Sequence, residues 1–223
     1  MRFENTSVYN IYSAMLGARN PMNSWNKSDS VFKGFDGKIE NTEIGKNDLE
    51  LAQTLIRAGS EHRKFMRQIF VSVDITAPLY WWKEFDTYKV GTVANSTSTM
   101  HKLASTPITI DCFEMDDFDE LDKLPLIELE NMRCTMRTYW EWVLIPMLEK
   151  LRIKYNETKD KRYWKELIRL LPESWLQRRT ITMSYENILK MVRERINHKL
   201  TEWSKSFIEW VNTLPYAKEL LFI

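Results

Sequence analysis

The chain has 223 residues, a formal net charge of +1 at pH 7, 43% hydrophobic residues and 28% charged residues. This composition is typical of a soluble globular protein, the length suits one domain, and the near-zero charge argues against a nucleic-acid partner. No apolar run approaches the ~20 residues of a membrane helix, and the first residues lack the apolar segment of a signal peptide. We therefore expect a single cytoplasmic domain over residues 1–223, without a membrane or nucleic-acid partner.

Few side chains are available for a metal site or for disulfides. Cys112 and Cys134 are the only cysteines, which favours two reduced core thiols over a disulfide framework or a zinc site. The acidic run that follows residue 113 lacks the spacing, the glycine and the closing glutamate of a calcium loop. The histidines are scattered, at His62, His101 and His198. We predict no metal site.

The first part of the chain predicts one short helix and a long loop. Apolar residues at helical spacing predict a helix over residues 11–16, and the Gly17 to Pro21 segment would end it. Residues 20–46 are rich in Asn, Ser, Gly and Lys, so we expect an irregular loop there. Long loops inside compact domains are often functional or disordered, and the sequence leaves both alternatives open.

A better defined helix follows this segment. Asn47 and Asp48 are suited to cap a helix over residues 49–58, and Gly59 would end it. Ser60 would cap a short helix after that.

Strand alternation and a cluster of aromatic residues mark the next segment. Apolar residues alternate over residues 69–75, which predicts a strand with one buried face. Pro78 suits the first turn of a helix, here residues 79–88, whose aromatic stripe is most simply explained by core packing. The polar loop that follows, residues 92–99, could hold a phosphate or a planar ring, or could simply cap a helix.

The middle of the chain predicts a second strand and two helices. Residues 106–113 alternate again and predict a strand. A long helix is expected over residues 127–155, with a kink at Pro146. A further helix over residues 163–171 would end at Pro172.

The C-terminal part predicts a strand or turn at residues 180–183, followed by a helix that Ser184 caps. Residues 203–211 predict the last helix. We expect an α+β fold with a central sheet flanked by helices, in which residues 69–75 and 106–113 share the sheet. The glycine-rich phosphate motifs GxGxxG and GxxxxGK[ST] are absent, and no Ser-His-Asp spacing supports hydrolysis, so the catalytic residues stay unknown.

Two blocks of the sequence resemble the flavin-dependent thymidylate synthase family. In the first, Ala77-Pro78 falls on the family's Ala-Pro step, and the family's Arg-His-Arg, Ser and Arg signature falls on Thr87-Tyr88-Lys89, Thr97 and Thr99. In the second, LPESWLQRRTITMSYENILKMVRER, from Leu171 to Arg195, matches the family's Leu-Pro turn, strand and helix. The resemblance covers the chain from about residue 47 onward.

The resemblance implies a nucleotide site and a flavin site. The nucleotide-binding positions that it implies, together with the polar loop, are Glu84, Lys89, Asn95, Ser96, Thr97, Ser98, Thr99 and Arg195. The flavin-binding positions that it implies are His62, Thr87, Tyr88, Lys89, Ser184, Glu186 and Lys190. We expect the loop 95–99 and Arg195 to face one cavity, with Lys89 at its edge. The family's homotetramer, with sites between subunits, is implied in the same way.

Several family cations are replaced in this chain, which bears on the reaction. Lys89 keeps a charge but not the bidentate fork of arginine, and Glu186 reverses the charge where flavin phosphates would lie unless another cation compensates. We therefore expect weak or absent FAD binding and a diverged protein that binds a nucleotide, with altered or lost synthase activity. The alternative is an active FAD-dependent thymidylate synthase or pyrimidine (hydroxy)methyltransferase with a folate one-carbon donor.

Overall fold

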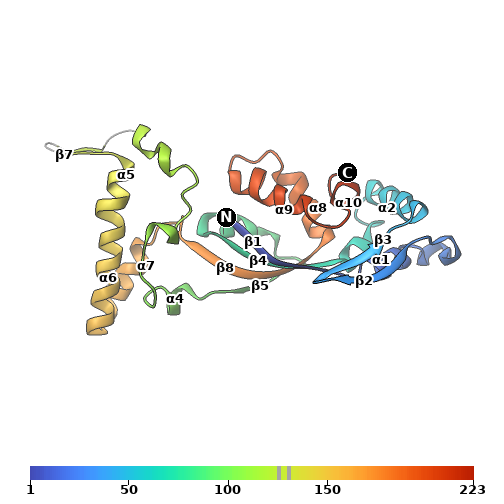
Figure 1. Cartoon of the computed structure of the whole chain (residues 1–223), viewed down its shortest axis with the longest axis horizontal. Helices are drawn as coiled ribbons and strands as arrows, with labels where there is room; N and C mark the ends of the chain where they lie inside the picture. Colours follow the sequence, from blue (N-terminus) through green and yellow to red (C-terminus); the bar gives the residue numbers. More distant parts are fainter. Residues whose placement is uncertain (125–126, 130–131) are drawn as a thin grey trace. The chain divides into compact units, whose positions relative to one another are not determined.

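The computed structural model describes residues 1–124, 127–129 and 132–223, and it shows the expected α+β fold (Figure 1). The chain divides into two compact units, which we describe separately. The sheet unit comprises residues 1–76, 84–95 and 179–223, and the helical unit comprises residues 77–83 and 96–178. A domain can contain more than one compact unit, so the single domain over residues 1–223 stays a prediction.

A six-stranded mixed sheet has the order β2-β3-β1-β4-β8-β5. Strand β1 pairs in parallel with β3 and antiparallel with β4. The ends of β4, β5 and β8 continue into the helical unit. The strands are β1 (Arg2–Tyr9), β2 (Val31–Asp36), β3 (Ile39–Glu43), β4 (Phe70–Pro78), β5 (Val93–Ser96) and β8 (Leu176–Ser184).

Strand β4 confirms the alternation over residues 69–75. Val71, Val73 and Ile75 are buried, whereas Phe70 lies in the opposite phase and is half exposed. The expected helix follows at once as α3 (Leu79–Phe85) and the 3-10 helix η4 (Asp86–Tyr88). The expected polar loop at 92–99 is wrong in part, because its first half forms β5, whose outer position in the sheet tolerates polar side chains.

The irregular loop expected at residues 20–46 is wrong. After two 3-10 turns, η1 (Asn20–Met22) and η2 (Trp25–Lys27), the segment forms the hairpin of β2 and β3. Asp36 and Ile39 pair across the two-residue turn Gly37-Lys38, in which Gly37 has a positive φ of 58° that glycine adopts at no steric cost. Polar composition hid a strand pair that buries Glu40 and Thr42.

Glu40 shows why this hairpin is ordered. Its carboxylate lies at the start of α1 (Ile11–Ala18) and accepts hydrogen bonds from the backbone N–H groups of Asn10, Ile11 and Tyr12. Thr42 Oγ1 donates to the same carboxylate at 2.6 Å. A carboxylate at a helix N-terminus satisfies orphan donors and the helix dipole, so the hairpin and α1 fix each other.

The cap expected for the next helix is also wrong. Helix α2 (Lys46–Ala58) starts before Asn47, with Gly45 as its N-cap, and Asp29 accepts from the N–H groups of Asn47 and Asp48 at 2.9 and 3.0 Å. The Asp48 side chain is instead turned into the protein, where it pairs with the buried Arg19. Gly59 ends α2 as predicted, at a φ of 108°.

Ser60 does not cap the following short helix. The segment forms the 3-10 helix η3 (Lys64–Gln68), which starts after Arg63 and has no side-chain cap.

Helices α8 (Tyr185–Arg195), α9 (Ile208–Asn212) and α10 (Ala217–Leu220) lie on one side of the sheet (Figure 1). The π-helix η8 (Glu202–Phe207) precedes α9. Trp210 stacks on Phe3 of β1 with ring centroids 4.8 Å apart, and its Nε1 donates to Thr6 Oγ1 at 3.0 Å. The C-terminal helix predicted from residue 203 is therefore confirmed, and it closes the core of the sheet unit.

In the helical unit, the strand expected at residues 106–113 is wrong. The segment contains the 3-10 helix η5 (Ile110–Cys112), and the backbone N–H of Ile108 donates to the Glu149 carboxylate at 2.8 Å. Ile108 and Phe113 are buried in an apolar cluster with Leu103, Leu144, Leu148 and Leu167. Their alternation reflects packing against helices, which periodicity alone does not distinguish from a strand.

The long helix expected at residues 127–155 starts later than predicted. Strands β6 (Ile127–Leu129) and β7 (Met132–Cys134) pair first, and residues 125–126 and 130–131 lie outside the described part of the chain. The helical run then follows as α5 (Met136–Tyr139), the π-helix η7 (Trp140–Leu144) and α6 (Ile145–Thr158). Thr135 caps α5 by accepting from the N–H of Thr138, which sets the start of the run.

The remaining elements of the helical unit are the short α4 (Thr99–Lys102), the 3-10 helix η6 (Phe118–Lys123) and α7 (Lys161–Leu170). Helix α7 confirms the prediction for residues 163–171 and starts slightly earlier, because Asp160 caps it. Among the residues that the structure describes, no helix is both long and apolar enough to cross a bilayer.

Candidate functional site

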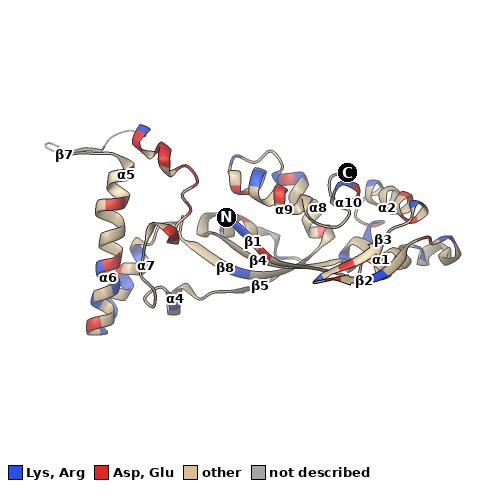
Figure 2. Ribbon diagram, viewed as in Figure 1, with Lys and Arg blue, Asp and Glu red and all other residues tan. Residues whose placement is uncertain are grey.

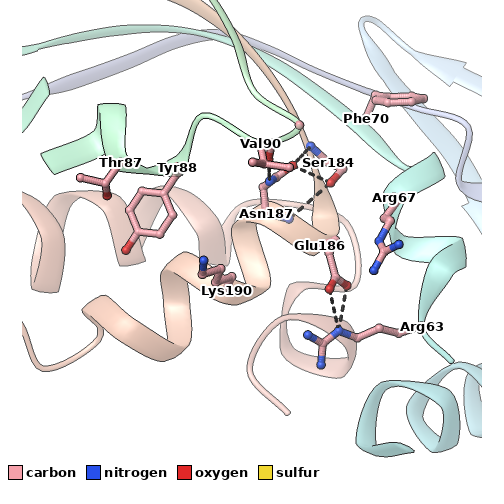
Figure 3. A pocket seen from close by; sticks show the side chains of 11 residues that line it. Arg63, Arg67, Phe70, Thr87, Tyr88, Val90, Ser184, Glu186, Asn187 and Lys190 are labelled. Carbon is pink, nitrogen blue, oxygen red and sulfur yellow. Dashed lines mark hydrogen bonds and ion pairs between the residues drawn. The ribbon is translucent and has the colours of Figure 1, made fainter. Parts of the chain in front are cut away.

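A pocket of about 550 Å³ opens in the sheet unit beside the start of α8, and we call it the α8 pocket (Figure 3). Its volume is within the usual range of small-molecule sites. Five elements, η3, β4, η4, β8 and α8, contribute side chains, so the pocket depends on segments that are far apart in sequence. Its lining residues are Arg63, Arg67, Phe70, Thr87, Tyr88, Val90, Gly91, Ser184, Glu186, Asn187 and Lys190.

A capping box shapes one wall of the α8 pocket. Ser184 Oγ accepts from the N–H of Asn187 at 3.3 Å, and Asn187 Oδ1 accepts from the N–H of Ser184 at 3.1 Å. Asn187 Nδ2 donates to the carbonyl of Val90 at 2.7 Å, which ties the segment after η4 to α8. Gly91 has a φ of 80°, and a Cβ there would lie 3.0 Å from Asn187 Oδ1, so this close approach favours glycine.

Arg63 neutralises the only acidic side chain of the lining. Its Nε donates to both carboxylate oxygens of Glu186, at 3.0 and 2.8 Å (Figure 3). The two side chains are 14% and 17% exposed, so the pair is shielded from solvent and stronger than a surface ion pair. The acid at position 186 therefore does not leave the pocket negative.

The other cations of the lining are not used in ion pairs. In the described part of the chain, Arg67 and Lys190 take part in none; Arg67 donates to the carbonyl of Ser60 at 3.2 Å, and Lys190 Nζ lies 5.7 Å from the Tyr88 ring centroid. The lining thus has three cations against the single carboxylate of Glu186. Such an excess attracts an anion, and arginine is well suited to phosphate.

Tyr88 is held at the pocket wall by a network of charged groups. Its hydroxyl donates to Glu194 at 2.7 Å and accepts from Arg195 Nε at 2.8 Å. Burial and the bond to Glu194 raise the pKa of Tyr88 above its ordinary value, although Arg195 opposes the shift. The phenol therefore stays neutral at pH 7, and its ring has a fixed orientation.

Glu84 and Arg195, both expected to bind a nucleotide, contact each other. Arg195 Nη1 donates to Glu84 at 2.8 Å, and Trp203 Nε1 donates to the same carboxylate oxygen at 2.9 Å. The Arg195 guanidinium also lies 5.0 Å from the Trp203 ring centroid, and its side chain is 18% exposed. Arg195 stabilises Tyr88 and Glu84 and is not part of the α8 pocket lining.

Five of the seven implied flavin positions converge on the α8 pocket, namely Thr87, Tyr88, Ser184, Glu186 and Lys190. The two others do not line it. His62 lines a separate pocket with residues of α1, α2 and η3, and Lys89 follows η4 and accepts a backbone bond from Thr92.

The polar loop residues have mainly structural contacts. Asn95 and Ser96 end β5, the N–H of Thr97 donates to the carbonyl of Arg178, and Ser98 caps α4. Thr99 starts α4 and accepts from Gln177 at 3.3 Å. That residues 95–99 and Arg195 face one cavity stays a prediction.

Sequence reasoning missed several lining residues, above all Arg63, Arg67 and Phe70. Arg63 immediately precedes η3 and Arg67 lies within it, so the sequence has two arginines four positions apart in this segment. Phe70 is apolar in the exposed phase of β4, next to strictly alternating buried residues. These two patterns were the available signals. Among the described residues, no group of His, Cys, Asp and Glu is arranged to hold a metal ion.

No protein-family model matches the sequence, and no curated protein sequence matches it. Solved structures do match in three dimensions. A flavin-dependent thymidylate synthase ThyX from Helicobacter pylori, in complex with FAD and dUMP, superposes with a TM-score of 0.66 over 100% of this chain and 98% of its own, at 18% identity. This chain has the ThyX fold. A second Helicobacter pylori ThyX structure with FAD and dUMP gives a TM-score of 0.66 at 16% identity, over 100% of this chain and 97% of its own.

The match confirms the fold that the two sequence blocks implied. Strand β4, helix α3, strand β8 and helix α8 follow one another in the order that the resemblance implied.

Proposed function

We propose that this protein binds a phosphorylated nucleotide in the α8 pocket and that its synthase chemistry is altered or lost relative to ThyX. The observation that carries the proposal is the cationic excess of Arg63, Arg67 and Lys190 beside the fixed ring of Tyr88. Cations suit phosphate oxygens, and an ordered aromatic ring suits a planar base or flavin.

The pocket residues also fit a flavin dinucleotide. FAD carries two phosphates, and Arg63, Arg67 and Lys190 would hold them, while Tyr88 and Phe70 supply aromatic contact. When bound, a flavin supplies hydride transfer, and the protein's part is to bind and orient it. Asn187 is already used in the capping box and in its bond to Val90, so its contribution is to keep the wall rigid.

The second candidate is an active FAD-dependent thymidylate synthase or pyrimidine (hydroxy)methyltransferase that uses a folate one-carbon donor. The pairing of Arg63 with Glu186 favours it, because it supplies the compensating cation that charge reversal at position 186 requires.

Titration of the purified protein with FAD, followed by quenching of flavin fluorescence, separates the two candidates. Weak or absent binding is expected if the lost signature cations dominate, and tight stoichiometric binding would favour the active enzyme. In the same titration, Lys190→Ala should lower the affinity for FAD or for a nucleotide roughly tenfold, since a contact to a charged group contributes ~1.5–3 kcal/mol. Absence of any FAD, dUMP or UMP binding at millimolar concentration would contradict the proposal.

The role of Arg195 is testable separately. We expect Arg195→Ala to lower the affinity for a pyrimidine nucleotide roughly ten- to a hundredfold. The variant loses the charge of Arg195 and also the hydrogen bond by which Arg195 supports Tyr88. Ser98→Ala should leave the nucleotide affinity nearly unchanged, because Ser98 caps α4 and does not line the α8 pocket. Calorimetry on both variants measures this. If nucleotide binding persists and Arg195→Ala leaves it unchanged, the expected nucleotide role of Arg195 is wrong.

The proposal includes a homotetramer, by resemblance to the family, and a cytoplasmic location, from the sequence pattern. Analytical ultracentrifugation of the purified chain tests the first, and a monomer at micromolar concentration would contradict it.

A further inference from the structure

We propose that the helical unit carries a second nucleotide site, independent of the α8 pocket. A pocket of about 290 Å³ lies where α4, α6 and α7 meet, and we call it the α7 pocket. It lies entirely within the helical unit. Its lining residues are Met100, His101, Ala104, Tyr155, Lys161 and Trp164.

The α7 pocket has two aromatic walls, of which Trp164 is fixed by a hydrogen bond. Trp164 comes from α7, and its Nε1 donates to the carbonyl of Met100 at 3.2 Å, which fixes the orientation of the indole. Tyr155 comes from the last part of α6 and is partly buried. Aromatic side chains that are held in place at a pocket wall are stacking platforms for bases, and stacking tolerates any base.

The backbone of the remaining wall is also anchored. The carbonyl of Ala104 accepts from Asn156 Nδ2 at 2.8 Å and from Arg152 Nη1 at 3.3 Å, so α6 holds the segment after α4. Leu103 is buried in the apolar cluster of the helical unit together with Leu148 of α6 and Leu167 of α7. The pocket is therefore built by packed elements and does not depend on a loose surface loop.

Among the described residues, two lysines have no acidic partner, one that lines the α7 pocket and one near its Tyr155 wall. Lys161 lines the pocket, and Lys159 Nζ lies 5.7 Å from the Tyr155 ring centroid. Neither lysine takes part in an ion pair within the described residues. Basic residues on α4, α6 and α7 are visible in Figure 2.

Neighbouring carboxylates are occupied by other cations. Asp160 pairs with Arg162 at 2.6 Å, and Glu157 pairs with Lys154 at 2.9 Å. The bond from Arg162 holds the pKa of Asp160 below its ordinary value, so this carboxylate stays ionised and engaged. Lys159 and Lys161 are therefore available to an external anion.

Aromatic walls and available lysines together indicate a planar ring that carries a phosphate, which is the chemistry of a nucleotide. The volume is at the lower end of the range for small-molecule sites, which suits a mononucleotide better than a dinucleotide. The same chemistry is present in a free nucleotide and at the end of a single strand, so the experiment includes both.

The test uses a background variant, Arg63→Ala with Lys190→Ala, which disables the α8 pocket and leaves the helical unit unchanged. Calorimetry with UMP should still detect binding in this background, whereas uridine, which lacks the phosphate, should bind at least roughly tenfold more weakly. Lys161→Glu in the same background should lower the affinity for UMP roughly ten- to a hundredfold. The matched control is Lys150→Glu, an exposed α6 lysine outside the pocket lining, which should change the affinity less than about twofold.

Tryptophan fluorescence locates the ligand. UMP should change the emission of the background variant, and Trp164→Phe should remove most of that change while circular dichroism confirms the fold. The affinity of a short oligothymidylate is measured by its displacement of UMP. An affinity higher than that of UMP assigns the site to a strand end, and a lower affinity assigns it to a free nucleotide. The proposal is overturned if UMP does not bind the background variant at millimolar concentration, or if Lys161→Glu and Lys150→Glu behave alike. The proposed function of the α8 pocket would instead be contradicted if the affinities for FAD and dUMP stay unchanged when Arg63 and Lys190 are replaced.

Discussion

Replacing Arg63 by alanine should lower the affinity of the α8 pocket for a nucleotide phosphate roughly a hundredfold, since a bond to a charged group contributes ~1.5–3 kcal/mol. The loss has a second cause, because Glu186 would keep its negative charge without a partner and repel the phosphate. Fluorescence or calorimetric titration with FAD and dUMP measures the effect.

The double variant Arg63→Ala with Glu186→Ala separates these causes. It should regain about tenfold of the lost affinity, because the repelling carboxylate is gone while the arginine contact stays absent. Arg57→Ala provides the control, since Arg57 is an exposed arginine at the end of α2 outside the pocket lining, and it should change affinity little. Equal affinities of the single and double variants would show that Glu186 does not repel the ligand.

Replacing Asp48 by alanine should lower the free energy of unfolding by about 3–5 kcal/mol, the usual cost of leaving a buried charge without its partner. Asp48 and Arg19 are 1% and 5% exposed. The carboxylate also accepts from Ser28 Oγ at 2.7 Å and from the N–H of Ser30 at 3.1 Å, so it ties the segment before β2 to α2. Urea denaturation of parent and variant gives the difference.

Two further variants and a pH series make this result specific. Arg19→Met with Asp48→Leu should recover much of the stability, because no buried charge is left unpaired, whereas Lys46→Ala breaks only an exposed pair and should be nearly neutral. Burial raises the pKa of Asp48, but bonds from Ser30, Ser28 and Arg19 outweigh it, so the pKa lies below the ordinary 3.8.

The sign of the pH dependence follows from this lowered pKa. The stabilisation by Asp48 is complete above its unfolded pKa and is lost as pH falls through the folded one. The parent should therefore lose its advantage over Asp48→Ala only below pH 3.8. An advantage that disappears near pH 6 would contradict the assignment.

Local patterns were sufficient where short-range physics decides the conformation. The alternation of Val71, Val73 and Ile75 predicted β4 because one face of a strand must be apolar to be buried. Ser184 predicted the start of α8 because a side-chain oxygen can satisfy a free backbone donor at a helix end. The order of these elements was enough to indicate the fold that the ThyX structures share.

Local patterns failed where a distant partner decides the outcome. Residues 106–113 alternate as a strand would, but Ile108 and Phe113 pack on α6 and α7 instead. Polar composition predicted a loop at residues 20–46, yet the segment forms a hairpin. Its Glu40 carboxylate accepts a hydrogen bond from the backbone N–H of Ile11 at the N-terminus of α1.

The sequence by itself determined the α+β class and the strand-to-helix order around Ala77-Pro78 and Ser184, because each of these depends on neighbours within a few positions. Only the tertiary structure decided the charge of the α8 pocket. Arg63 and Glu186 are 123 residues apart and meet only in the folded chain, where low solvent exposure makes their pairing decisive. The residue that seemed to reverse the charge of the site is neutralised by one that no local pattern connects to it.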